Sequence, residues 1–388
     1  MNENGLNTYI DFGSSRIRIG VFDIESSKNI FTSEKDCISN FSEKYFDISK
    51  SNEVINYLIK SAEKKVDTHI KNINLMIDTP DMFSIDISIK KISDNKKYSN
   101  NDIHSLLQEG KNLVQKNYFN KKIIHMIVKK FIFDDIEYFE IPNKELNYNS
   151  LIIELKFICF SNNILKKLQD IFNANHIVIN NIYCSSYVRS ANYNLIFENY
   201  KKKIFLDIGY NKSSVIVFED KTVLFFNILP VGGKHITKDI SILLKIDIND
   251  AENLKKSLNK SDVIFENKFD ENIKLKSPDL SKQVIHARVD EIIKLNLANE
   301  YFNSFFHQND DSVLIFTGEG SKILNKNSIY LEEKFDFFNE ISFFEEDSTL
   351  ICESGFNFGK EKKFQEVSFQ TKKSKNKGFF EKFFYFFN

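Results

Sequence analysis

Two copies of one short pattern lie in opposite halves of this 388-residue chain and constrain its fold. The first copy spans residues 9–22, and the second spans residues 204–218. Each copy reads as an apolar strand, an Asp-x-Gly step, a polar turn and a second apolar strand, which is typical of a β-hairpin. Two such hairpins so far apart predict a duplicated architecture with a phosphate site between the halves.

The acid and the glycine of the pattern suit a site for Mg²⁺ and phosphate. Asp11 and Asp207 each end a strand, where a carboxylate can take Mg²⁺ largely through its water shell. Backbone amides and hydroxyls of the following turn can hold phosphate oxygens. We therefore predict both aspartates as metal ligands, although an acid that merely ends a strand is the alternative for either one alone. The turn residues that would form the phosphate cradle are Gly13, Ser14, Ser15, Arg16, Gly209, Asn211 and Lys212.

The composition is that of a globular protein with several domains. Hydrophobic residues make up 42% of the chain and charged residues 28%, with a net charge of -1, so nothing points to nucleic acid as a partner. The four cysteines are scattered, which argues against disulfides and zinc sites and favours a reducing compartment. The N-terminus has no signal-peptide pattern, and no apolar run is long enough to span a bilayer.

Strands and helices alternate along most of the chain, which predicts an α/β fold. A helix is expected over 53–66, between a third strand at 30–37 and another at 73–78. The block 82–158 reads as β-α-β-β and has the size of an inserted subdomain, with Asn101 or Asp102 as the expected N-cap of its helix. The second half continues as a strand over 222–229, two helices, a long helix from about 284 to 303, and a buried strand at 313–317.

Two later segments carry further candidate binding residues. Glu252 lies three residues before Lys255, so both share one helix face, where Glu252 can take ribose hydroxyls and a lysine stem can flank a base; Lys256 is the adjacent candidate. Gly318 and Gly320 follow the buried strand and would let the backbone approach a purine closely. A solvated helix face and a simple turn are the respective alternatives.

The order of these pieces resembles the actin-like ATPase superfamily and, more narrowly, the FtsA family of bacterial cell-division proteins. Residues 229–240, with Gly232 and Gly233, resemble that family's signature in the second half, as does the segment 250–255 that follows. Residues 286–291 resemble its long helix. The resemblance implies an actin-like two-domain fold with duplicated sheets around a nucleotide cleft, and it makes 82–158 the FtsA-type subdomain 1C.

The resemblance also implies a division of the chain and a set of partners. We expect ATP and Mg²⁺ in the cleft, the C-terminal peptide of the tubulin-like protein FtsZ on the second half, other division proteins, and self-association into filaments. The expected location is the cytoplasmic face of the inner membrane at the septum. The expected parts are domain 1 (1–81 and 159–200), subdomain 1C (82–158), domain 2 (201–233 and 306–355), subdomain 2B (234–305), a flexible linker (356–376) and an amphipathic membrane-targeting helix (377–388).

The last residues form a strongly amphipathic segment after a polar stretch. On a helical wheel its phenylalanines share one broad arc, while Glu381, Lys382 and Tyr385 fall on the other side. A segment this short and amphipathic suits a helix lying in the plane of an anionic membrane surface. Docking on the protein's own core or on a partner is the alternative. The proposed membrane residues are Phe379, Phe380, Phe383, Phe384, Phe386 and Phe387.

Several positions depart from the family pattern. Tyr210 and Asn211 stand where glycines usually let the backbone approach phosphate, and Glu319 replaces a usual glycine of the adenine loop. No water-activating residue is identified near Ser185, so no catalytic residue is assigned and at most weak ATPase activity is expected. Another actin-like membrane adaptor, similar to PilM, is the first alternative function. A small-molecule kinase of the same superfold is the second.

Overall fold

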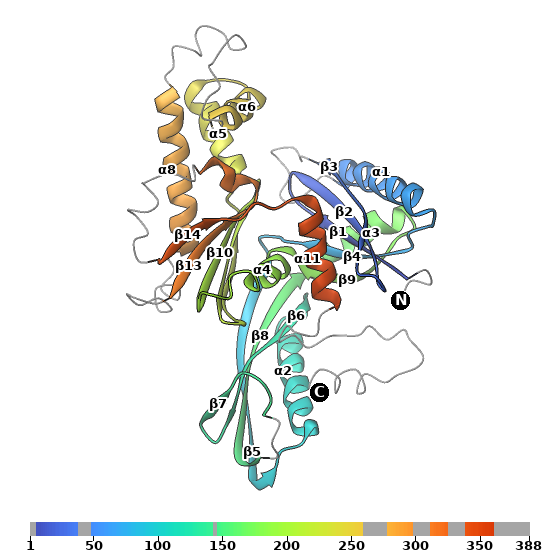
Figure 1. The fold of residues 1–388 in the computed structure, drawn as a ribbon, viewed down its shortest axis with the longest axis vertical. Helices are drawn as coiled ribbons and strands as arrows, with labels where there is room; N and C mark the ends of the chain where they lie inside the picture. The colour runs from blue at the N-terminus through green and yellow to red at the C-terminus, as the bar shows by residue number, and fades with distance from the viewer. Residues whose placement is uncertain are drawn as a thin grey trace.

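The computed structural model describes residues 5–37, 48–142, 146–258, 278–297, 311–324 and 338–360. Three β-sheets lie in this part of the chain (Figure 1). The first has the order β3-β2-β1-β4-β9. Its strands are β1 (Leu6–Phe12), β2 (Arg16–Asp23), β3 (Asn29–Asp36), β4 (Asn72–Ile77) and β9 (Val178–Cys184).

The second sheet repeats the plan of the first, with the order β12-β11-β10-β13-β14. In both sheets three antiparallel strands are followed by two strands that run parallel to the hairpin's first strand. Asp11 and Asp207 occupy equivalent registers, because Asp11 pairs with Arg18 and Asp207 with Ser214 across their hairpins. The predicted duplication is confirmed. The strands are β10 (Lys202–Ile208), β11 (Ser213–Glu219), β12 (Thr222–Leu229), β13 (Ser312–Thr317) and β14 (Glu340–Phe343).

The third sheet extends below the other two and has the order β5-β8-β6-β7 (Figure 1). It contains β5 (Phe83–Lys97), β6 (Lys121–Phe133), β7 (Ile136–Tyr138) and β8 (Asn147–Ser161), and α2 (Asn100–Asn117) lies against it. This unit has its own hydrophobic core, in which α2 contributes Ile103 and Leu106. The N-cap of α2 is Ser99 rather than the predicted Asn101 or Asp102, since Asp102 is the fourth residue of a reciprocal capping box with Ser99.

The consecutive apolar residues of β10 explain how the second sheet is covered on both faces. Ile204, Leu206 and Ile208 point to a core shared with α5 (Gly233–Leu244), α6 (Ile248–Leu258) and α8 (Pro278–Leu297). Phe205 points the opposite way, into the core of the first half. A strand buried on both faces therefore joins two cores. The described part of α8 begins at Pro278, six residues before the predicted start at Val284.

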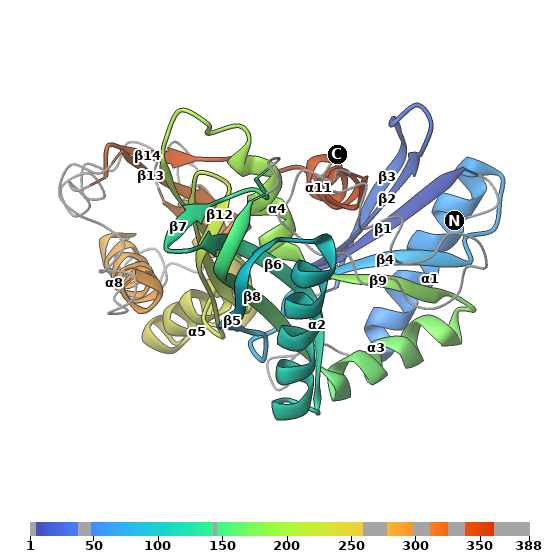
Figure 2. The ribbon, with the colours of Figure 1, turned by 90° about the horizontal axis from the view of Figure 1, so that it is seen from below.

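Helices also cover both faces of the first sheet (Figure 2). On one face lie α1 (Ile48–Val66) and α3 (Asn162–Ala174), and α4 (Ser185–Asn194) lies between the two sheets. Because α4 follows β9 directly, its first turn opens where the two hairpins face each other. Among the described residues, no helix has the length and apolar character needed to cross a membrane.

The last described helix, α11 (Ser348–Lys360), corrects the predicted linker that began at residue 356. Phe356 is buried and stacks on Phe22 with ring centroids 4.7 Å apart, and it meets Tyr9 edge to face. This aromatic packing keeps the chain helical to Lys360. It also places α11 on the first sheet, whereas residues up to 355 were predicted to belong to the second domain.

Candidate functional site

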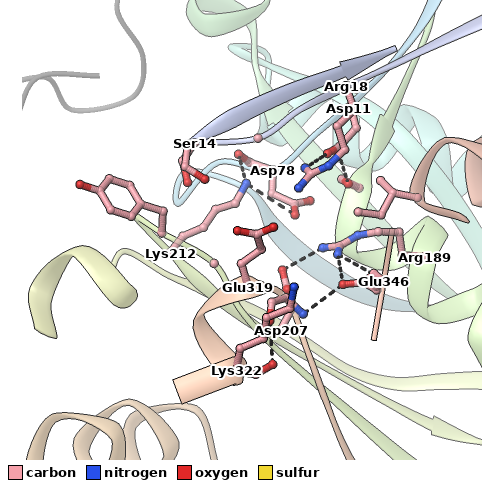
Figure 3. Close-up of a pocket in the computed structure, with 18 of the residues that line it drawn as sticks. Asp11, Ser14, Arg18, Asp78, Arg189, Asp207, Lys212, Glu319, Lys322 and Glu346 are labelled. Atoms are coloured by element: carbon pink, nitrogen blue, oxygen red, sulfur yellow. Dashed lines mark hydrogen bonds and ion pairs between the residues drawn. The ribbon is translucent and has the colours of Figure 1, made fainter. Parts of the chain in front are cut away.

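A cavity of about 500 Å³ lies where the two hairpins face each other. Both halves line it: the first through residues such as Asp11, Ser14 and Asp78, the second through residues such as Asp207 and Lys212 (Figure 3). Its volume falls within the range of small-molecule sites. Anything bound here would contact both sheets.

Asp11, at the end of β1, is already bonded through both carboxylate oxygens. Its Oδ2 accepts from a guanidinium nitrogen of Arg18 at 3.0 Å, and its Oδ1 accepts from the Ser185 hydroxyl at 2.6 Å. Arg18 comes from the paired strand β2, directly opposite in the hairpin register, and Ser185 begins α4. The first predicted metal ligand is therefore held by an arginine of its own hairpin.

Asp207, the second predicted ligand, belongs to an ion-paired group that crosses between the halves. Arg189 of α4 donates to Asp207 Oδ2 at 2.8 Å and to both oxygens of Glu346 at 2.8 and 2.9 Å. Burial would lower the pKa of Arg189, but Asp207 and Glu346 raise it well above its usual range. Tyr193 and the Gly318 amide also donate to Glu346, so this carboxylate has four hydrogen bonds.

Lys212, in the turn after β10, reaches across the cavity to Asp78 in the first half (Figure 3). Its ammonium donates to the Asp78 carbonyl at 2.7 Å and lies 3.6 Å from the carboxylate. Burial would raise the pKa of Asp78, but Lys212, Arg189 and hydrogen bonds from Ser186 and Cys184 hold it below its usual range. A lowered folded-state pKa means that this stabilisation is present at neutral pH and is lost only as the pH falls through that value.

The two hairpin turns also touch each other directly. The Asn211 amide donates to the Ser14 hydroxyl at 3.2 Å, and within the second turn the Gly209 amide donates to the Lys212 carbonyl at 2.9 Å. Arg16 does not line the cavity but bridges the halves at its edge, 3.0 Å from Glu319. Several donors predicted for phosphate are thus used within the protein.

Gly318 lets the loop after β13 approach Asp207. Its φ is +82°, in the left-handed region, and a Cβ atom there would lie 2.1 Å from Asp207 Oδ1. Gly320 has a similar position, 2.6 Å from the Ile208 carbonyl by the same measure. The two glycines predicted to contact a purine therefore allow this loop to pack closely against β10.

The segment after β12 lies behind the second turn and outside the cavity lining. Gly232 packs against that turn, since a Cβ atom would lie 2.6 Å from the Gly209 carbonyl, and Gly233 donates its amide to the same carbonyl. Lys255 is buried and donates to Glu252 at 2.6 Å and to the Gly233 carbonyl at 3.1 Å. Burial lowers the pKa of Lys255, partly offset by Glu252. Lys256 lies 3.4 Å from Glu252.

The cavity suits a nucleotide in size but does not fit a divalent cation. Among the described residues, no group of three or more His, Cys, Asp or Glu side chains could hold a metal ion. The nearest acids, Asp11, Asp78 and Asp207, each have a basic side chain of the protein as a partner. Six acidic and four basic side chains line the cavity, so its lining also gives little net attraction for a polyphosphate.

Sequence reasoning missed Asp78, Arg18, Arg189 and Glu346 as residues of this site. Asp78 directly follows β4, which runs parallel to β1, so the strand-end rule that selected Asp11 could have found it. Arg189 and Glu346 carry no local signal, because their meeting depends on how α4 and α11 pack. The proposed membrane residues, Phe379 to Phe387, lie outside the described residues.

Comparisons with known proteins agree with the family resemblance. The model of the family described as "Cell division protein FtsA" matches residues 204–342. Cell division protein FtsA of Bacillus subtilis is 26% identical over 318 residues, covering 76% of this chain and 69% of that protein. The protein of the same name from Enterococcus faecalis is 23% identical over 265 residues, 66% of this chain. The matched region spans 58% of the Enterococcus protein's length, less than two thirds.

Among solved structures, the fold is similar to a chain of the PilM-PilN type IV pilus biogenesis complex. The TM-score is 0.62 at 12% identity, over 90% of this chain and 94% of that one. Such low identity speaks for the fold alone. Together with the two sheets of equal topology, these comparisons lead to one conclusion: the chain has an actin-like fold and resembles cell division protein FtsA.

Proposed function

We propose that this chain is an FtsA-like adaptor of cell division. In this role it binds FtsZ through the C-terminal peptide of that protein, attaches it to the cytoplasmic face of the membrane at the septum, and self-associates into filaments with other division proteins nearby. The observation that carries the proposal is the FtsA family match over 204–342, which includes the second hairpin and the described parts of α5, α6 and α8.

We assign two parts of the structure to subdomains of the FtsA family. The unit of β5–β8 with α2 is assigned to subdomain 1C, and α5, α6 and α8 to subdomain 2B. We assign FtsZ binding to the second of these, within residues 234–305. The direct test is capture of the chain by the immobilised C-terminal peptide of FtsZ, and a chain that is not retained contradicts the FtsA-like assignment.

We further propose that the cavity between the hairpins binds an adenine nucleotide. Its position between two sheets of equal topology and its volume of about 500 Å³ support this. Asp11, Ser14, Ser15 and Asp207 line it, as does Gly209. When bound, ATP would place its phosphates between the two hairpin turns. Since the turn donors and the acids already have protein partners, binding rather than turnover is the proposed role, and hydrolysis is slow or absent.

The terminal segment supplies a prediction about membrane attachment. Replacing Phe383 and Phe384 together by glutamate places two charges in the apolar arc, and we expect the full chain to lose co-sedimentation with vesicles of anionic phospholipid. A buried phenylalanine contributes about 1.5–3 kcal/mol, so losing two should reduce partitioning by about a hundredfold or more.

A matched control separates charge from apolar contact in that experiment. Tyr385→Glu with Asn388→Glu adds the same charge on the polar side of the wheel, and it is expected to weaken binding far less. Equal binding of the wild-type chain and the Phe383/Phe384 double variant would contradict membrane anchoring by this segment.

The PilM-like alternative is favoured by one observation, the fold similarity to the PilM-PilN complex over 90% of the chain. Both candidates are membrane adaptors of the same fold, so partner binding distinguishes them. Retention by the FtsZ peptide supports the first, and its absence together with binding to a PilN-type peptide supports the second. ATP consumption in the presence of sugars would instead indicate a kinase.

A further inference from the structure

The acids of the cavity bear on how a nucleotide binds there, an inference that rests on the proposed nucleotide binding. Mg²⁺ at a nucleotide site is held through one or two carboxylates, directly or through water. A carboxylate can do this only while its oxygens can still accept from metal or water. The candidates at strand ends are Asp11, Asp78 and Asp207. Of the other acids in the lining, Glu319 is paired with Arg16 and Glu346 with Arg189.

Asp78 has the most complete set of partners. Its Oδ1 accepts from the Ser186 amide at 3.1 Å, the Ser186 hydroxyl at 3.2 Å and the Cys184 thiol at 3.2 Å. Its side chain is 2% exposed, and the Lys212 ammonium closes the side that faces the cavity. A metal ion would have to displace Lys212 to reach it.

The other two carboxylates are closed by arginines. Arg18 and Ser185 take the two oxygens of Asp11, and Arg189 takes Asp207 Oδ2. Asp207 Oδ1 faces Gly318, where even a methyl group would lie 2.1 Å away. Guanidinium groups bind carboxylates strongly and stay charged at any physiological pH.

The position of Lys212 is equally specific. It is the third residue after Gly209, and its side chain reaches from the second half to Asp78 of the first half (Figure 3). Its side chain is 12% exposed, so its charge is fixed in the space between the two hairpins. A compact cation is thereby held next to the place where a phosphate between the turns would lie.

We infer that Lys212, with Arg18 and Arg189, takes the place of a divalent cation in this cavity, so that nucleotide binds there without Mg²⁺. The arginines neutralise Asp11 and Asp207, which would otherwise hold the metal, and the Lys212 ammonium, which donates to the Asp78 carbonyl, is placed to donate to a phosphate as well. This makes Lys212 the residue that determines the metal requirement of the site.

The test is the affinity of the full chain for a fluorescent ATP analogue, measured in Mg²⁺ and again in excess chelator. The two dissociation constants are expected to agree within about twofold, whereas coupled ligands typically change each other's affinity by about 5–150-fold. An affinity at least fivefold higher in Mg²⁺ overturns the inference and leaves nucleotide binding intact. Absence of binding in both conditions overturns the proposed nucleotide binding itself, and this inference with it.

Variants then test Lys212 itself. Lys212→Met frees the cavity side of Asp78, and its binding is expected to become stronger in Mg²⁺ than in chelator by at least about fivefold. Lys212→Met with Asp78→Asn leaves no uncompensated charge, so it keeps the fold while losing about tenfold or more in affinity under both conditions. Lys221→Met removes the same charge at an exposed turn and should behave as wild type. A Lys212→Met chain that stays indifferent to Mg²⁺ contradicts the role of Lys212.

Discussion

Replacing Arg189 by methionine is expected to lower the free energy of unfolding by about 3–5 kcal/mol. The side chain of Arg189 is 10% exposed, that of Asp207 11% and that of Glu346 4%, so the change leaves two buried carboxylates without their cation. Unfolding of the full chain in urea, followed by circular dichroism, measures the effect. Arg189 joins α4, β10 and the segment before α11. Its loss should therefore also loosen the contact between the two halves of the protein.

The pH dependence of stability tests whether uncompensated charge causes this loss. Buried carboxylates that have lost their cation have a raised folded-state pKa, so the folded variant binds more protons than the unfolded chain. Its stability deficit relative to wild type should therefore shrink as the pH falls from 7 towards about 5. A deficit that stays constant over this range would point to lost packing rather than uncompensated charge.

Arg288→Met is the matched control for Arg189. Arg288 also pairs with two carboxylates, those of Asp239 and Glu291, but all three side chains are between 27% and 51% exposed. Pairs this exposed contribute about 0–1 kcal/mol, because water screens the charges that remain. A loss at Arg288 as large as that at Arg189 would contradict burial as the cause.

Gly318→Ala is expected to lower the free energy of unfolding by about 2–5 kcal/mol, the sum of overpacking and a left-handed Cβ. The new methyl group would lie 2.1 Å from Asp207 Oδ1 and 2.7 Å from the Ile208 carbonyl. The loop must therefore move away from β10, which displaces the Gly318 amide from Glu346. Urea unfolding gives the stability, and nucleotide titration reports the change in the cavity.

Gly5→Ala separates the two contributions to that loss. Gly5 also has a positive φ, +66°, but a Cβ atom there would have no neighbour within 4 Å. Its replacement should cost about 1–2 kcal/mol, the backbone term alone. Equal losses of unfolding free energy in the two variants would show that the close approach of Gly318 to Asp207 does not contribute to the effect.

The duplicated hairpin shows why much of the fold could be predicted from the sequence. Strand, acid, glycine and turn are local signals, and their repetition at Asp11 and Asp207 identified both faces of the cavity. The β5–β8 unit was likewise visible as a change in pattern, because its first strand, β5, alternates apolar and polar residues over Ile85, Ile87 and Ile89.

The partners of the two acids could not be predicted in the same way. Arg189 meets Asp207 because α4 packs between the sheets, and Glu346 joins them from a segment far along the chain. Such contacts depend on tertiary packing, which leaves no periodic pattern of residues in the sequence. Glu252 and Lys255 show the same limit. They share one helix face as predicted, but Lys255 bonds to Thr237 and Gly233, and neither residue lines the cavity.

The packing of α11 has a mechanical consequence. Residues 361–388 follow Lys360, at the end of a helix whose Cys352, Phe356 and Phe358 are buried against the first half. Any tension on this terminal segment is therefore carried first by the aromatic contacts with Tyr9 and Phe22. Glu346 lies before the opposite end of this helix, so a pull on the terminal segment reaches the aromatic contacts before it reaches the ion pair with Arg189. An attachment through the terminal segment would therefore act first on the packing of α11 against the first half.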